Sequence, residues 1–150
     1  MPDRGLPFLD EHTRLVEAPP AAVWPALVAR LATGGGVPTT AYATLVGAHP
    51  GRATGCFPDV GSALPGFAVS EADPPVRLSL TGRHRFSRYR LAFVLEPRGA
   101  ATLVRAVSHA EFPGLHGRLY RAAVIESRAH VVLLRRLLAD VDRRCRTARS

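Results

Sequence analysis

The clearest feature of the chain is an alternation of apolar and polar residues in two neighbouring segments, 76–83 and 87–96. A period of two is typical of β-strands that have one face on a core. The predicted core-facing set is Val76, Leu78, Leu80, Tyr89, Leu91, Phe93 and Leu95. The intervening residues, Arg77, Ser79, Thr81, Arg88, Arg90, Ala92 and Val94, then face the other way. Residues 82–86 form the tip of the predicted hairpin.

Further strands are predicted at 12–18, 66–72 and 101–112, with a short one near 54–57. Pro and Gly bound these segments, as is typical of turns. Short connections between consecutive strands predict an antiparallel sheet.

Helical spacing of apolar residues appears in three other segments. Residues 21–32 predict a helix that tolerates Pro25 in its first turn and ends at the glycines of 33–36. Residues 39–48 predict a second short helix. The longest pattern, 118–146, predicts one helix with an apolar face made of Tyr120, Val124, Ser127, Val131, Leu134, Leu138 and Val141.

These elements predict one α+β domain over residues 1–150, in which the C-terminal helix covers one face of the sheet. A chain of 150 residues fits a single domain, and 47% hydrophobic residues are typical of a globular one. Residues 1–11 are expected to form a loose leader and residues 145–150 a basic tail.

The element order and two phrases, "VEAPPAAVWPAL" and "EFPGLHGRLYRA…HVVLLRRLL", resemble the SRPBCC superfamily of START domains, birch-pollen-allergen-like proteins and polyketide cyclases. The hairpin "GFAVSEADPPVRLSLTGRHRFSRYRLAFVLEP" looks like that of bacterial members. The resemblance covers roughly residues 12–144. It implies the helix-grip fold, a curved antiparallel sheet around the C-terminal helix with an apolar cavity between them. It also implies binding of a small apolar or aromatic molecule, but assigns no catalytic residue.

The predicted lining of that cavity is Trp24, Phe67, Leu78, Leu80, Tyr89, Leu91, Phe93, Tyr120, Val124 and Val131. An enzymatic version would be a cyclase or aromatase that moves protons through His84, His109, His116 or Tyr120, without metal or other cofactor. His109 and Glu111 would form a pair in the cavity only if their strand face pointed inward. The alternate face, Val104, Ala106, Ser108 and Ala110, is more apolar and is the one expected to face in.

A net charge of +8 and a pI near 11.1 suggest a second hypothesis, a non-catalytic protein that binds nucleic acid or an acidic partner through arginines. The chain contains no Lys and no Asn, which is typical of GC-rich coding sequences and weakens that inference. Tyr89 and Phe93 have the opposite parity to Arg88 and Arg90, whereas a nucleic-acid surface needs aromatics among its cations. A solvated outer face is therefore favoured.

Several other functions lack their sequence signals. The six histidines have neither HxH nor HExxH spacing, so a metal site is not expected. Cys56 and Cys145 are expected to be free thiols in a reducing compartment. Ser87 lacks the GxSxG context of a hydrolase nucleophile. The apolar runs are too short for a membrane span and the N-terminus does not read as a secretion signal, so a cytoplasmic protein is expected.

Overall fold

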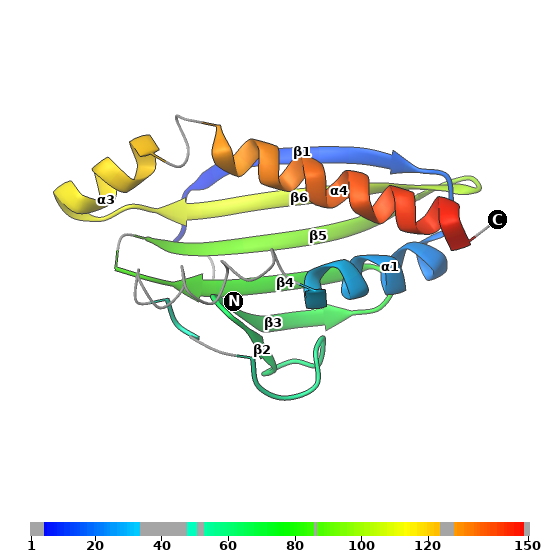
Figure 1. Cartoon of the computed structure of the whole chain (residues 1–150), viewed down its shortest axis with the longest axis horizontal. Helices are drawn as coiled ribbons and strands as arrows, with labels where there is room; N and C mark the ends of the chain where they lie inside the picture. Colours follow the sequence, from blue (N-terminus) through cyan, green and yellow to red (C-terminus); the bar gives the residue numbers. More distant parts are fainter. Residues whose placement is uncertain (1–4, 34–47, 51–52, 86, 124–127, 149–150) are drawn as a thin grey trace.

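The computed structural model describes residues 5–33, 48–50, 53–85, 87–123 and 128–148. Its strands form one antiparallel sheet in the order β1-β6-β5-β4-β3-β2 (Figure 1). The strands are β1 (Phe8–Val16), β2 (Ala63–Leu64), β3 (Phe67–Asp73), β4 (Arg77–Arg83), β5 (Arg88–Arg98) and β6 (Ala101–Glu111). The helices are α1 (Pro20–Thr33), α3 (Gly114–Arg121) and α4 (Ala129–Ala148).

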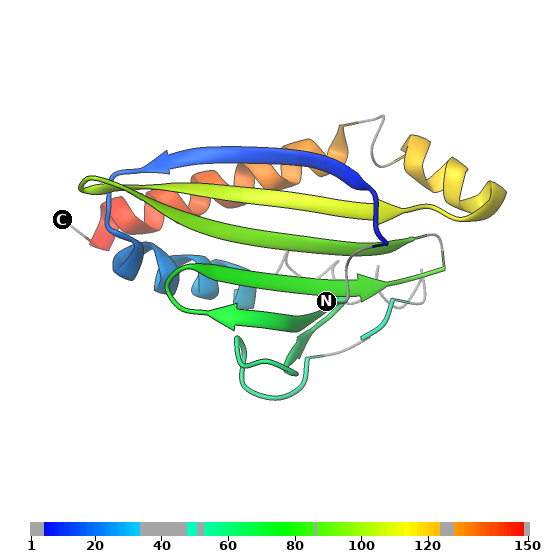
Figure 2. The same ribbon diagram turned by 180° about the vertical axis from the view of Figure 1, so that it is seen from behind.

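Helices α1 and α4 cover the same face of the sheet, which we call the inner face, and the two views agree on this (Figures 1 and 2). Helix α4 lies along β1 and packs on α1. Helix α3 lies at the opposite end of the molecule from the C-terminus, beyond the end of β6. Within the described part of the chain, no helix has the length and apolarity needed to cross a membrane.

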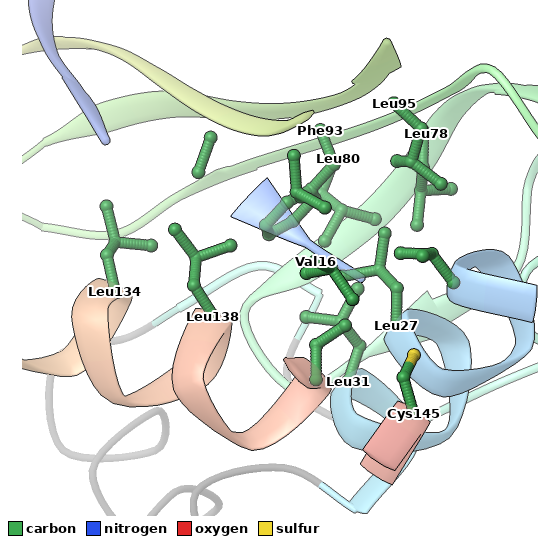
Figure 3. Close-up of a cluster of buried hydrophobic side chains, with 14 of the residues drawn as sticks. Val16, Leu27, Leu31, Leu78, Leu80, Phe93, Leu95, Leu134, Leu138 and Cys145 are labelled. Atoms are coloured by element: carbon green, nitrogen blue, oxygen red, sulfur yellow. The ribbon is translucent and has the colours of Figure 1, made fainter. Parts of the chain in front are cut away.

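The core lies between the sheet and the two covering helices (Figure 3). The strands contribute Leu78, Leu80, Phe93, Leu95 and Val104, all at most 2% exposed. The helices contribute Val23, Leu27, Leu31, Leu134, Leu138, Val141 and Cys145. Burying each large apolar side chain stabilises the fold by about 1.5–3 kcal/mol, so this cluster attaches both helices to the sheet. This cluster confirms which residues of β4, β5 and β6 were predicted to face the core. It also confirms the predicted apolar face of residues 134–141.

Ion pairs attach α4 to its neighbours at the edge of the core. Arg14 on β1 contacts the buried carboxylate of Asp142 at 2.8 Å. Arg30 of α1 donates to Asp140 at 2.9 Å and thereby lowers the pKa of that carboxyl. Because ion pairs need specific partners, these two pairs fix the position of α4 on an interface that is otherwise apolar.

The outer face of the sheet carries charged residues, as the alternation predicts. Arg105 donates to Glu11 and Glu96 across strands, and its hydrogen bond lowers the pKa of Glu96. Arg77 pairs with Glu71 at 3.1 Å. The arginines of this face therefore meet carboxylates of neighbouring strands.

Several predicted boundaries are wrong. The single helix over 118–146 is two helices, and Arg128, just before α4, has a φ of 65°, which a continuous α-helix does not allow. Strand β1 begins at Phe8, inside the predicted leader, and α4 continues to Ala148, through most of the predicted basic tail. Residues 39–47 of the expected second helix lie outside the described residues.

Three smaller expectations also need correction. Thr54 forms only an isolated bridge with Ala63 in place of a strand. Because α1 begins at Pro20, Pro25 lies beyond the first turn. Val76 precedes β4 and is 48% exposed, so it is not a core residue.

Candidate functional site

The inner face changes character along its length. Near α1, Phe93 and Leu78 stand opposite each other and are fully buried. One step nearer the β4–β5 tip, Leu91 is only partly buried, and so is Tyr89 in the following step. Among the described residues, this end of the inner face therefore keeps partly exposed apolar side chains.

Aromatic rings gather at that end. The ring of Tyr89 lies 5.2 Å from Phe67 and 5.6 Å from His84, centroid to centroid. The ring of His84 in turn lies 4.6 Å from Tyr120 of α3, edge to face. These rings come from β3, β5, α3 and the β4–β5 connection, and we call them the aromatic cluster: Phe67, His84, Tyr89 and Tyr120.

The position of Tyr89 is fixed from two sides. Its hydroxyl donates to the carbonyl oxygen of Gly66 at 2.5 Å. Its ring passes over Gly82, where a side chain would collide with the ring and with the Gly66 carbonyl. Gly66 itself has a φ of 85°, a conformation that glycine adopts readily. Two glycines thus hold the tyrosine against the sheet.

His84 is the group in this cluster best suited to proton transfer. Partial burial lowers the pKa of its imidazole below the ordinary value of 6.5, so the ring is neutral at pH 7 and can accept a proton. Its Nε2 lies 3.5 Å from the hydroxyl of the buried Ser87. Tyr120 brings a second polar group to the ring of His84.

A polar group that sequence reasoning missed lies on the same face, between β1, β6 and α4. The carboxylate of Asp10 contacts Nε2 of His12 at 3.1 Å and Nε2 of His130 at 3.3 Å. The same nitrogen of His130 lies 3.3 Å from Oγ of Ser108. Among the described residues, no group of three or more His, Cys, Asp or Glu side chains is arranged to hold a metal ion.

A hollow of about 740 Å³ lies elsewhere, between the last turns of α1 and α4. Its walls include Asp140, which accepts hydrogen bonds from Arg30 and from Arg143, and Thr147, whose hydroxyl donates to a helix carbonyl. Arginines at helix C-termini also complement the helix dipole. This hollow is polar and is not the predicted apolar cavity.

Comparison with known proteins gives structural matches only. No model of a protein family matches the chain, and no curated protein matches it. CalU16 from Micromonospora echinospora is 16% identical with a TM-score of 0.56, over 93% of this chain and 81% of that one. A protein from Nitrosospira multiformis is 16% identical with a TM-score of 0.59, over 91% and 94%. Ara h 8.0201 is 11% identical with a TM-score of 0.55, over 95% and 99%.

The chain has a helix-grip fold, which it shares with these structural matches. The predicted α+β class and the predicted resemblance are confirmed at the level of the fold. In this helix-grip chain the long C-terminal helix is α4, which packs on β1 and on α1 at the inner face of the sheet.

The helix-grip arrangement separates the predicted proton-transfer residues. His84 and Tyr120 meet in the aromatic cluster. His109 lies on the outer face, with its ring 5.9 Å from that of Phe8, as the favoured parity predicted. Glu111 pairs there with Arg88, so the His109 and Glu111 pair does not face the helix. His116 is exposed on α3.

The predicted lining residues also divide into two groups. Leu78, Leu80 and Phe93 are at most 1% exposed and pack in the core of the helix-grip fold. Those that keep partly exposed surface are Trp24, Phe67, Tyr89, Leu91, Tyr120 and Val131. Val124 lies outside the described residues.

Proposed function

We propose that the chain binds a small apolar or aromatic molecule against the inner face of its sheet, beside the aromatic cluster. The observation that supports this most directly is the partial exposure of Leu91, Tyr89 and Phe67 on a face that is fully buried nearer α1. Small-molecule sites are mostly apolar, with a few placed polar groups. Here His84 and Tyr120 supply such groups at the rim.

A cyclase or aromatase-like activity is the second candidate, supported by the contact of His84 with Tyr120. A neutral imidazole can take a proton from a bound polyketide-like chain, and a phenol can return one. In that case replacing His84 with Ala abolishes turnover of a polyketide substrate while its affinity changes little. An unchanged turnover rate excludes His84 from the chemistry.

Nucleic-acid binding by the arginines has less support. On the outer face, Arg105 pairs with Glu11 and Glu96, and Arg77 with Glu71. A duplex would have to displace these carboxylates. Tight binding to DNA with a steep salt dependence would nevertheless favour this hypothesis over ours.

Calorimetric titration with 2-methoxynaphthalene, a neutral bicyclic aromatic, tests the proposed function. We expect saturable binding that weakens about tenfold in Leu91→Ala, because the variant loses apolar contact with the probe. Leu15→Ala is the matched control, since Leu15 lies on the outer face of β1 and is half exposed. Equal effects of the two substitutions contradict the proposal, and so does an absence of binding by this probe and by its analogues 2-naphthol and 2-naphthoate.

A further inference from the structure

A second polar group lies between β1, β6 and α4, beside the Arg14–Asp142 ion pair on the inner side of β1. It consists of Asp10, His12, Ser108 and His130, which we call the inner polar cluster. The side chains of His12, Asp10 and His130 are 14%, 23% and 24% exposed, so they are partly shielded but reachable. Ser108 is 4% exposed.

The cluster borders the proposed site. Ser108 on β6 stands opposite Asp10 on β1 and opposite Leu91 on β5. Tyr89 belongs to the next step of the same face, opposite Ala110. Neighbouring strands lie about 4.8 Å apart. A bicyclic ring in contact with Leu91 on β5 therefore lies about one strand spacing from Ser108 on β6.

Hydrogen-bond capacity remains in this cluster. With hydrogen on Nε2, His12 donates to one oxygen of Asp10 and His130 to the other. A carboxylate offers about four acceptor positions, which leaves two on Asp10. Where the N–H of His130 is shared with Oγ of Ser108, the serine keeps its own hydroxyl hydrogen for a further acceptor.

The geometry does not fit two familiar uses of such residues. A Ser-His-Asp triad needs the serine and the carboxylate on different nitrogens of the imidazole, so that a proton can cross the ring. Here Nε2 of His130 contacts both Ser108 and Asp10. Nor does the cluster form a metal site, since no suitable group of His, Cys, Asp or Glu occurs in the described part of the chain.

We infer that the inner polar cluster is a subsite for a neutral hydroxyl group on the bound ring, so that the ligand class is a phenol or enol. A hydroxyl both donates and accepts, which matches an acceptor on Asp10 beside a donor on Ser108. A carboxylate ligand would meet the negative charge of Asp10, and a hydrocarbon would leave both groups unpaired. This inference rests on the proposed function, because it needs a ring on the same face.

Three probes of one ring size test it by calorimetric titration: 2-naphthol, 2-methoxynaphthalene and 2-naphthoate. We expect the wild-type protein to bind 2-naphthol about tenfold more tightly than 2-methoxynaphthalene, since a hydrogen bond to a charged group is gained. The naphthoate should bind most weakly. Asp10→Asn and Ser108→Ala should each bring the ratio of the first two affinities to within about threefold, with little change for 2-methoxynaphthalene.

Glu11→Gln is the matched control, because Glu11 is the neighbour of Asp10 and faces the other side of the sheet. It should keep the wild-type ratio. If Asp10→Asn does not fold, Ser108→Ala alone decides, because it removes one oxygen atom and leaves the carboxylate in place.

The two possible failures are distinguishable. Equal wild-type affinities for 2-naphthol and 2-methoxynaphthalene, or a ratio that both cluster variants preserve, overturn the subsite and leave the proposed function standing. Failure of all three probes to bind overturns the proposed function, and the subsite with it.

Discussion

Gly82 offers the sharpest test of how the aromatic cluster is built. An alanine methyl at this position would lie 2.6 Å from Cε2 and 2.7 Å from the hydroxyl oxygen of Tyr89, and closer still to the carbonyl oxygen of Gly66. Real Cβ atoms essentially never approach another heavy atom within 3.0 Å. In Gly82→Ala, Tyr89 or the strands must therefore move.

The cost has two parts. Overpacking costs about 1–3 kcal/mol, and losing the hydrogen bond from Tyr89 to Gly66 costs about 0.5–1.5 kcal/mol. We therefore expect Gly82→Ala to lower the free energy of unfolding by about 2–4 kcal/mol. Urea titration followed by the fluorescence of Trp24, the one tryptophan of the chain, measures this change. The same variant should weaken 2-methoxynaphthalene binding, since Tyr89 belongs to the aromatic cluster.

Gly5→Ala is the control, because nothing lies within 4 Å of a methyl group built there. It should change the free energy of unfolding by less than about 0.5 kcal/mol. A Gly82→Ala protein as stable as the wild type would show that the tyrosine is not held between the two glycines.

Two more predictions concern the core and the pH dependence of stability. Leu138 is 2% exposed, so Leu138→Ala should lower the free energy of unfolding by about 2–5 kcal/mol. Leu133 is 64% exposed on the same helix, so Leu133→Ala should change this free energy little. Equal urea midpoints of the two variants would contradict the packing of α4 on the sheet. Burial lowers the pKa of His84 in the folded protein. Below pH 6.5 the unfolded chain therefore binds more protons at this residue than the folded chain does. The contribution of His84 to the free energy of unfolding is complete above pH 6.5 and is lost as the pH falls toward the folded-state pKa. Between about pH 7.5 and about pH 5.5, the free energy of unfolding should therefore fall less in His84→Gln than in the wild type. Identical decreases would exclude His84 as the cause of this pH dependence.

The alternation of residues was enough to predict both faces of the sheet. It placed Leu91 and Tyr89 inward and Arg88 outward, because a strand fixes the side of every residue once one is known. It also placed His109 on the outer face through its apolar neighbours Val104 and Ala106. Local patterning determines this part of the fold.

The break before α4 was not predictable in the same way. Apolar residues continue at helical spacing through 118–146, and neither Pro nor Gly occurs near Arg128. A positive φ at a residue with a side chain is uncommon and depends on tertiary packing, which no local pattern records.

The inner polar cluster was missed for a related reason. Asp10 falls in the predicted leader, for which the sequence predicts no strand and therefore no inner or outer side. His130 is 120 residues away and reaches Asp10 only because α4 lies along β1. Such a contact depends on the packing of distant elements, whereas the strand parity of His12 follows from the predicted strand 12–18, and that of Asp10 requires only an earlier start of the same strand.

The position of this cluster is informative about function. Polar groups placed in a core cost free energy unless their hydrogen bonds are satisfied, and nearer α1 the inner face of β5 and β6 is indeed apolar at Phe93 and Ala106. The change to Ser108, which is still buried, and to Asp10 occurs where Leu91 and Tyr89 of β5 become partly exposed and where the aromatic cluster begins. The neighbouring Arg14–Asp142 pair is buried on its Asp142 side and attaches α4 to β1, whereas Asp10, His12 and His130 stay partly exposed. Partial exposure combined with spare hydrogen-bonding capacity is what a ligand-facing wall requires, and this coincidence is why we connect the polar and aromatic clusters to one site.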